Sequence, residues 1–427
     1  MMTEQKQVIP EGYKQTEIGI IPSDWDVCAL GDAVEFLDGL RRPVKSGDRA
    51  KIVGIYPYYG ASGIVDYVND YLFDDDLILL GEDGENILSR NLPLAFRVSG
   101  KIWVNNHAHV MKPKIDFHIG YLTDYLESLD YSLLNSGTAQ PKLNKQTCLK
   151  IKVVKPSLKE QTVIANALSD VDALISELEK LIAKKQAIKT ATMQQLLTGK
   201  TRLPEFALRE DGTPKGYKQS ELGEIPEDWE AIKMGGLAKI QRGASPRPID
   251  SPIWFDRNSS VGWLRISDVS KTDKYLTETT QSLSELGIAN SRFVTRDSLV
   301  MSICATVGKP IITKKNLCIH DGFVVFNDLV IEQNYMYYVL KDLEPEWSKQ
   351  GQTGSQMNLN TELINSTQII VPADKHEQTA ISLVFSAMDE ELQNLVARLN
   401  KTRQIKQGMM QELLTGKTRL VKPEVTV

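Results

Sequence analysis

Two segments of the chain, residues 156–203 and 372–427, contain the hydrophobic periodicity of long amphipathic helices. In each, apolar residues recur every three or four positions over about 40 residues, a spacing close to a coiled-coil register. These positions are Ile164, Leu168, Val171, Ile175, Leu178 and Ile182 in the first segment and Ile381, Phe385, Met388, Leu392, Leu395 and Leu399 in the second. At about 1.5 Å per residue, each helix would reach about 60 Å. Because a helix with one apolar stripe needs a partner, we expect the two to pack antiparallel.

The two helical segments belong to an internal repeat. The sequence GYKQTEIG from Gly12, followed by Ile-Pro and by Trp25, recurs as GYKQSELG from Gly216, followed by Ile-Pro and by Trp229. The segment QQLLTGKTRL after the first helix recurs after the second as QELLTGKTRL. The repeat predicts an approximate two-fold symmetry within one chain.

The sequence between the repeated segments has a different character. Residues 28–155 and 232–371 contain short β-branched and aromatic runs broken by Gly, Asn and Asp, which indicates globules of mixed helices and strands. The two stretches match each other poorly. We therefore expect an α/β (mixed α+β) fold with two different globular domains separated by two long antiparallel, coiled-coil-like helices. The expected divisions are a first domain in residues 1–155, a central helix in 156–203, a linker and second domain in 204–371, and a C-terminal helix and tail in 372–427.

Composition narrows the choice of compartment and partner. The 427 residues contain no apolar run long enough for a membrane span, and the N-terminal segment does not resemble a secretion signal, so we expect a cytoplasmic protein. The four cysteines are widely spaced, without the paired spacing of zinc or redox sites. A net charge of −5 argues against non-specific coating of nucleic acid. Any contact with DNA must come from local basic patches.

Several motifs suggest catalysis and are better explained otherwise. The Gly-Lys-Thr sequences at Gly199 and Gly416 lack the upstream glycine and the preceding strand of a phosphate-binding loop, so we interpret them as helix ends. The sequence shows neither the cofactor-binding glycine motif nor the motif for a flipped base that an adenine methyltransferase would need. It also shows no convincing carboxylate and lysine cluster of a metal-dependent nuclease and no helicase motif. His107 and His109 would share one face of a strand, but without an evident third ligand we favour a structural or DNA-facing pair over a metal site. The chain is expected to be non-catalytic.

These features together resemble the specificity subunits of type I restriction-modification systems. The resemblance covers nearly the whole chain and rests on GYKxTEIGxIPxDW at Gly12, YxxYGASGI at Tyr56, VNNHAH at Val104 and LLTGKTRL after each helix. It implies two target-recognition domains that each bind half of a split DNA site, with helices that set the spacer and dock two methyltransferase subunits. Restriction subunits would then join. The resemblance places S-adenosylmethionine, ATP and Mg on those partner subunits, with no cofactor in this chain.

Basic, amide and hydroxyl side chains in the globules are candidates for reading double-stranded DNA, because Arg pairs with guanine, Asn or Gln with adenine, and Lys with phosphate. In the first globule they are Arg41, Arg42, Lys45, Tyr58, Tyr59, Ser62, His107, His109, Gln140 and Lys142. In the second they are Arg242, Ser245, Arg247, Arg265, Lys309, Gln356 and Asn358.

Subunit docking is predicted at the two helix ends, because the resemblance implies a partner there. The candidates are Leu196, Leu197, Gly199, Lys200 and Arg202, and in the second copy Leu413, Leu414, Gly416, Lys417 and Arg419. Two alternatives stay open: a structural coiled-coil adaptor that binds proteins rather than DNA, and a methyltransferase or nuclease that acts alone.

Overall fold

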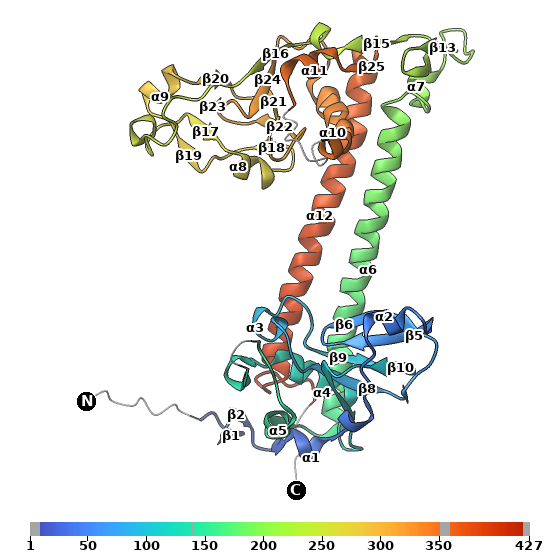
Figure 1. The fold of residues 1–427 in the computed structure, drawn as a ribbon, viewed down its shortest axis with the longest axis vertical. Helices are drawn as coiled ribbons and strands as arrows, with labels where there is room; N and C mark the ends of the chain where they lie inside the picture. The colour runs from blue at the N-terminus through green and yellow to red at the C-terminus, as the bar shows by residue number, and fades with distance from the viewer. Residues whose placement is uncertain (1–8, 138–139, 351–358, 422–427) are drawn as a thin grey trace. The chain divides into compact units, whose positions relative to one another are not determined.

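The structure is a computed structural model that describes residues 9–137, 140–350 and 359–421 (Figure 1). The chain divides into two compact units. The first unit comprises residues 1–180 and 396–427, and the second comprises residues 181–395. The first unit thus joins two stretches that are far apart in the sequence.

The first unit is built on two four-stranded sheets, with the orders β4-β11-β8-β9 and β6-β5-β10-β7. Only β10 and β5 pair parallel, and their neighbours in these sheets are antiparallel. The bounds are β4 Val34–Phe36, β5 Val53–Gly60, β6 Gly63–Val68, β7 Phe73–Asp74, β8 Leu77–Gly81, β9 Ala95–Val98, β10 Lys101–Val104 and β11 Ala108–Pro113. All five residues of β8 are buried, in agreement with its continuous apolar sequence.

Shorter elements complete the first unit. A hairpin of β1 (Tyr13–Thr16) and β2 (Gly19–Pro22) precedes β3 (Asp26–Ala29), which pairs with β12 (Lys152–Lys155). Helix α4 (Ile119–Ser128) contacts β9. The other helical turns are α1 Leu30–Ala33, η1 Asp38–Leu40, α2 Ser46–Arg49, α3 Asn86–Ser89, η2 Ser132–Leu134 and α5 Lys145–Leu149.

The second unit contains a five-stranded sheet of order β16-β24-β21-β22-β18 and a four-stranded sheet of order β19-β17-β23-β20. The bounds are β16 Lys239–Arg242, β17 Gly262–Leu264, β18 Tyr275–Leu276, β19 Gln281–Ser282, β20 Arg292–Val294, β21 Leu299–Ser302, β22 Pro310–Thr313, β23 Leu317–Ile319 and β24 Phe323–Asn327. A hairpin of β13 (Tyr217–Ser220) and β14 (Gly223–Pro226) precedes β15 (Trp229–Lys233), which pairs with β25 (Gln368–Pro372). The helices are α7 Pro204–Ala207, η3 Met234–Gly236, η4 Pro252–Trp254, α8 Ile266–Ser270, α9 Glu285–Ala289, α10 Gln333–Gln350 and α11 Thr361–Ser366.

Apart from β18, which has no counterpart in the first unit, the strands of the two pairs of sheets share one topology. The order β4-β11-β8-β9 corresponds to β16-β24-β21-β22, and β6-β5-β10-β7 corresponds to β19-β17-β23-β20. The parallel pair of β10 with β5 also recurs, as β23 with β17. The predicted fold class is therefore confirmed, and the internal repeat extends into globules whose sequences hardly match.

Two helices of 39 residues each, α6 (Leu158–Leu196) and α12 (Lys375–Leu413), contribute to both units. In the first unit Lys406 pairs with Asp172 and Arg403 with Glu179, at 2.7 and 2.6 Å. In the second unit Lys185 pairs with Glu391 at 2.6 Å, and Lys189 pairs with Asp389. Residue numbers rise along one helix as they fall along the other, so the helices are antiparallel in each unit, as predicted.

The apolar stripes of these helices serve two kinds of contact. Ile164 and Leu168 are buried in the core of the first globule, and Ile381 and Phe385 in the core of the second. Farther along, Leu178, Leu392 and Leu399 are also buried. The remaining predicted packing positions are half-buried, namely Val171, Ile175, Ile182, Met388 and Leu395. The stripe thus attaches each helix to a globule at its N-terminal end.

No helix in the described part of the chain is both long enough and apolar enough to cross a membrane.

Candidate nucleic-acid interface

In the first unit, many of the predicted contact residues gather where β4, β8 and β10 end and β11 begins. The antiparallel pairing of β11 with β8 sets His109 opposite Leu80 and Ala108 opposite Gly81. Glu82 and Asp83 follow directly on β8. Residues from four separate stretches of sequence therefore meet at one edge of the sheet.

His109 lies at the centre of this group and is 1 % exposed. Its Nδ1 lies 2.8 Å from Asp38 Oδ2, and its Nε2 lies 2.9 Å from the carbonyl oxygen of Leu143. Both partners are acceptors, so both ring nitrogens donate and the imidazole is positively charged. Burial opposes that charge, but the hydrogen bonds to Asp38 and Cys148 and the negative charges of these two groups together outweigh it and raise the pKa of His109 to about 10.

Arg41 belongs to the same network of hydrogen bonds and ion pairs. Its Nη1 donates to Glu82 Oε2 and to the carbonyl of Ala108, both at 2.7 Å. Glu82 also faces Lys142 Nζ at 3.4 Å. Arg41 and His109 are therefore committed inside the unit, where they support the surrounding loops rather than offer a free contact surface.

The other candidates of the first unit differ in exposure. Arg42, Lys45, His107, Gln140 and Lys142 are exposed, and His107 Nδ1 lies 2.9 Å from Asp83 Oδ2. Ser62, at the turn between β5 and β6, is half-buried. Tyr59 is also half-buried. Tyr58 is 1 % exposed, and its hydroxyl accepts from the amide of Val44 at 2.9 Å, so its ring is core.

In the second unit, three of the predicted residues surround Asp321. Ser245 Oγ donates to Asp321 Oδ1 at 2.8 Å, Arg242 Nε donates to the Asp321 carbonyl at 2.6 Å, and Arg247 Nη2 lies 3.5 Å from Asp321 Oδ2. This carboxylate was not among the sequence candidates. Asp321 thus connects the end of β16, through its carbonyl, with the loop that follows, through its carboxylate.

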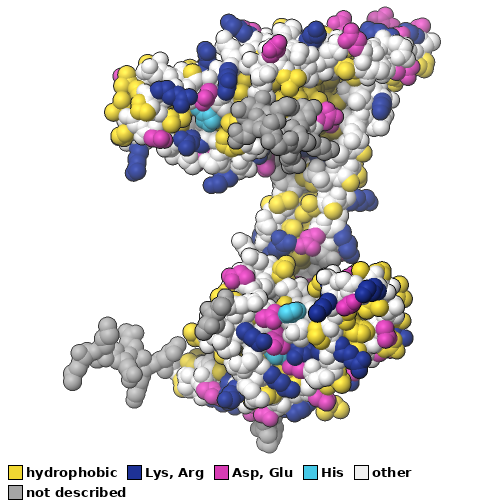
Figure 2. All heavy atoms as spheres, viewed as in Figure 1, with side chains coloured by type: hydrophobic (Ala, Val, Ile, Leu, Met, Phe, Trp, Pro, Cys, Tyr) yellow, Lys and Arg dark blue, Asp and Glu magenta, His cyan; other side chains and the backbone are white. Residues whose placement is uncertain are grey.

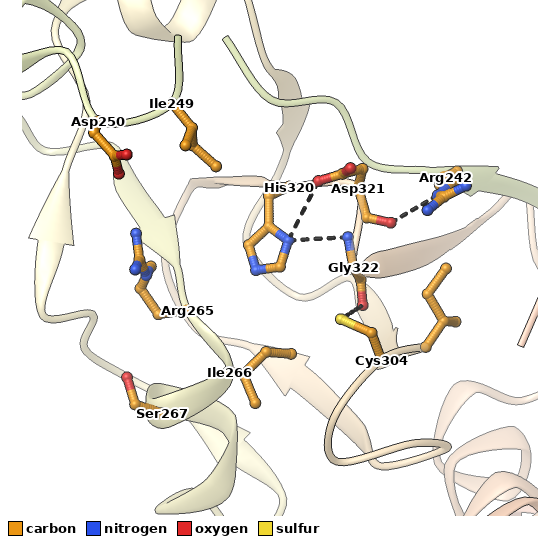
Figure 3. A pocket seen from close by; sticks show the side chains of 11 residues that line it. Arg242, Ile249, Asp250, Arg265, Ile266, Ser267, Cys304, His320, Asp321 and Gly322 are labelled. Carbon is orange, nitrogen blue, oxygen red and sulfur yellow. Dashed lines mark hydrogen bonds and ion pairs between the residues drawn. The ribbon is translucent and has the colours of Figure 1, made fainter. Parts of the chain in front are cut away.

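Asp321 lies on the wall of a cavity of about 560 Å³ (Figure 3). Arg242 and Arg265 line it together with His320, Asp250 and Cys304. Arg265 is exposed and directly follows β17. Lys309 does not line the cavity; it is half-buried, and its Nζ donates to the carbonyl of Ser270 at 3.3 Å. Gln356 and Asn358 lie outside the described residues.

His320 occupies the place in the second unit that Asn105 occupies in the first. Each directly follows an inner strand of its four-stranded sheet, β23 or β10. His320 Nδ1 accepts from the amide of Gly322 at 2.9 Å, and Asn105 Oδ1 accepts from the amide of His107 at 2.7 Å. The same turn is thus closed by different side chains in the two units.

Sequence reasoning missed His320, Asp321 and Asp250. The sequence itself held no signal for them, although CIHDGF, from Cys318, is the equivalent in the second unit of WVNNHA, from Trp103. The match becomes apparent only when β23 and β10 are superposed in their sheets, since the two sequences share no residue at equivalent positions.

Charges of both signs surround the two sites. Figure 2 shows Lys and Arg side chains mixed with Asp and Glu on the visible face of each unit, rather than one continuous basic patch. Among the described residues, no group of three or more His, Cys, Asp or Glu side chains is arranged to hold a metal ion. The arrangement supplies hydrogen-bond donors and acceptors for recognition.

The segments after the two helices form equivalent clamps within their own units. In the first unit Arg419 binds Glu160 Oε2 at 2.7 Å and both carboxylate oxygens of Asp24 at 2.9 Å, while Trp25 Nε1 donates to Glu160 at 3.0 Å. We call this group of four residues the first clamp. Glu160 is 1 % exposed, so its charge is neutralised inside the unit.

The second clamp consists of Arg202, Glu377, Asp228 and Trp229. Arg202 Nε donates to Glu377 Oε1 at 2.9 Å, its Nη1 donates to Asp228 at 2.7 Å, and Trp229 Nε1 donates to Glu377 Oε2 at 3.1 Å. These contacts repeat those of the first clamp one for one.

The predicted docking residues are mostly occupied by such internal contacts. Leu196, Leu197, Leu413 and Leu414 are buried in the unit cores. Gly199 and Gly416 adopt positive φ of 68° and 72°, as residues that end helices do. Arg202 and Arg419 belong to the clamps, which leaves Lys200 and Lys417 exposed.

Comparisons with known proteins agree on one family. The sequence model described as the type I restriction modification DNA specificity domain matches residues 22–190 and 226–404. The MjaVIII specificity subunit of a type I restriction enzyme from Methanocaldococcus jannaschii is 25% identical over 96% of this chain and 96% of that protein. The EcoDI specificity subunit from Escherichia coli is 22% identical over 95% of this chain and 92% of that protein.

A solved structure also resembles this chain in fold. It is the S subunit of a type I restriction-modification system from M. genitalium, with a TM-score of 0.58 and 12% identity. The match covers 91% of this chain and 96% of that one. At this identity the likeness concerns the fold alone.

Proposed function

The chain belongs to the type I restriction modification DNA specificity family, and from this premise we propose that its two units read the two unlike halves of a bipartite DNA site. The chain is a sequence-specific DNA-recognition subunit and does no chemistry of its own. The observation that carries the proposal is the pair of equivalent sites with different side chains. At the turn after β10 and β23 the first unit has Asn105 and the second has His320. One scaffold with different donors and acceptors is suited to two different base sequences.

The long helices are proposed to set the unread gap between the half-sites. Each has 39 residues, and a helix rises about 1.5 Å per residue. The predicted division into two recognition domains, at residues 1–155 and 204–371, and two spacer helices, at 156–203 and 372–427, belongs to this proposal. Internal two-fold symmetry would let two copies of one methyltransferase subunit meet equivalent surfaces.

The partners of the proposed complex are double-stranded DNA, two methyltransferase subunits and restriction subunits. S-adenosylmethionine, ATP and Mg are assigned to those other subunits, and the whole would act in the cytoplasm. For docking, Lys200 and Lys417 are the exposed members of the predicted set. The buried leucines would act indirectly, by holding the helix ends in place.

A reciprocal domain exchange tests the proposal. Residues 28–155, from within β3 to the end of β12, are replaced with the equivalent domain of a relative that reads another sequence, and the methylome of cells with the matching methyltransferase is determined. One half of the methylated site should change and the other should stay. Exchange of residues 232–371 is the matched control and should change only the other half.

Two results would contradict the proposal. An unchanged methylated sequence after both exchanges would favour an adaptor that does not read DNA. Methylation of a plasmid by the purified chain, without added subunits, would favour an enzyme that acts alone.

A further inference from the structure

The cavity of the second unit presents hydrogen-bonding groups of both kinds. Arg265 and His320 bring nitrogen donors into it, while Asp250 brings a carboxylate (Figure 3). Ile266 and Ile303 form apolar parts of the wall. A planar group with acceptors on one side and a donor on the other would match this arrangement.

The protonation of His320 is fixed by its surroundings. Nδ1 accepts from the amide of Gly322 at 2.9 Å, so the proton of the neutral ring lies on Nε2. The Asp321 carboxylate lies 3.8 Å from Nδ1, too far for a hydrogen bond that would draw a second proton. Burial lowers the pKa of His320 and Arg265 lowers it further, against the opposing charge of Asp321. Near pH 7 the ring is therefore neutral, and Nε2–H remains a donor.

Arg265 and Asp250 are the free charged groups of the cavity. The backbone amide of Arg265 donates to Asp268 Oδ2 at 3.0 Å, which fixes the residue between β17 and α8. Within the described residues, the guanidinium of Arg265 has no carboxylate at ion-pair distance, and Asp250 has no basic partner. Both side chains are exposed and therefore available to a ligand.

We propose that this cavity reads the major-groove edge of one G·C base pair in the half-site bound by the second unit. Guanine offers two acceptors there, N7 and O6, and the paired cytosine offers its N4 amino group as a donor. Arg265 and the Nε2–H of His320 donate to guanine, and Asp250 accepts from cytosine. The inference rests on the proposed function, because it assigns one contact within the proposed interface.

Other ligands fit the cavity less well. An A·T pair would turn the N6 amino group of adenine toward the two donors, leaving a donor unpaired, which is costly when water is excluded. A phosphate group would meet the carboxylates of Asp250 and Asp321, and like charges repel. The mixed charges of the wall thus favour a base pair over the DNA backbone.

The first test replaces single guanines with 7-deazaguanine, which lacks the N7 acceptor. Binding of the complete methyltransferase complex to its own recognition duplex is measured with each guanine replaced in turn. One replacement in the second unit's half-site removes one acceptor of the charged Arg265 and should weaken binding about 10- to 150-fold, the range for a single hydrogen bond to a charged group. With Arg265→Gln the same replacement should have little further effect, and other base pairs should be accepted at that position.

Arg257→Gln is the matched control, because Arg257 is an exposed arginine of the same unit that does not line the cavity. It should leave the recognised sequence unchanged. A second variant, His320→Asn, places here the side chain that closes the equivalent turn of the first unit. It should also relax the choice at the same base pair, without affecting the first half-site.

The outcomes separate this inference from the proposed function. If Arg265→Gln and His320→Asn leave every base of the second half-site read as before, while exchange of residues 232–371 still changes that half-site, the inference is wrong and the proposed function stands. A recognised half-site without any G·C pair would also overturn it. If the exchange itself changes nothing, the proposed function fails.

Discussion

His109 donates from both ring nitrogens, to Asp38 and to the carbonyl of Leu143, whereas Nδ1 of His320 accepts from the amide of Gly322. The first ring is therefore a buried cation and the second a neutral donor. The neighbours set this difference, since both rings are largely removed from water. In the first unit the charge ties η1 to the loop before α5, and in the second the neutral ring leaves one donor for a ligand.

The buried cation predicts a pH dependence of stability. The pKa of His109 is about 10 in the folded chain against 6.5 for an unperturbed histidine, so the folded state holds the proton more tightly. This stabilisation should be complete below pH 6.5 and should be lost as the pH rises toward 10. The free energy of unfolding, measured by urea titration across this range, checks the sign.

Asp38→Asn should remove most of that dependence, because the carboxylate holds the proton on the ring. The variant should be less stable near neutral pH by about 3 kcal/mol, since a buried charge loses its partner. Asp75→Asn breaks an exposed pair with Lys112 and should change little. Equal pH profiles for wild type and Asp38→Asn would contradict a charged His109.

At the scale of elements, each clamp joins the end of one long helix to the start of the other. Arg419 follows α12 and binds Glu160 near the start of α6, and Arg202 follows α6 and binds Glu377 near the start of α12. The recurrence of this pattern in the two copies of the repeat thus has a structural reason. The Arg, Glu, Asp and Trp residues of each clamp bind one another and so connect the end of one helix to the start of its antiparallel partner.

Removing the arginine of a clamp should destabilise its unit. Arg202→Leu leaves the carboxylate of Glu377, 1 % exposed, without its cationic partner, and the expected loss is about 3–5 kcal/mol. Lys200→Leu removes an exposed charge two residues away and serves as the control. Equal unfolding midpoints for the two variants would show that the clamp does not hold the helix end.

The glycine that ends each helix should tolerate no side chain. Gly416 has a φ of 72°, and a Cβ there would lie 2.5 Å from Pro22 Cδ. Gly416→Ala should therefore cost at least about 1–2 kcal/mol from the left-handed backbone alone. Gly408, inside α12, has open space around it, so Gly408→Ala should stabilise the chain by about 0.5–1 kcal/mol. Thermal unfolding of both variants tests this contrast, and equal shifts would refute it.

Much at this scale could be predicted from the sequence. The apolar spacing of α6 and α12 is local, and the two copies of LLTGKTRL repeat almost unchanged, so helices and repeat are visible without a structure. The candidate sites could not be predicted in this way. Asp38, Glu82, His109 and Leu143 meet only through strand pairing between distant segments, and the role proposed for His320 rests on the equivalence of β23 with β10. Residue type alone placed Tyr58 among the contact candidates, although its ring is core.

At the scale of the whole molecule, both long helices contribute residues to both units. In the second unit Lys185 pairs with Glu391 at 2.6 Å, so positions near Ala183 in α6 lie opposite positions near Asn394 in α12. The proposed spacer therefore consists of two helices of equal length. A change in one helix must be matched in the other to keep the apolar seam in register.

Insertion of one heptad after Ala183 and another after Asn394 should lengthen the unread gap and leave both half-sites unchanged. Seven helical residues add about 10 Å, which corresponds to about three base pairs at 3.4 Å each. Methylome sequencing of cells that carry the variant with its methyltransferase measures the gap directly. The same heptad inserted after Asp211, in an exposed turn, adds chain without adding helix and should leave the gap unaltered. Altered bases in either half-site, or an unaltered gap after the double insertion, would show that helix length does not set the spacing.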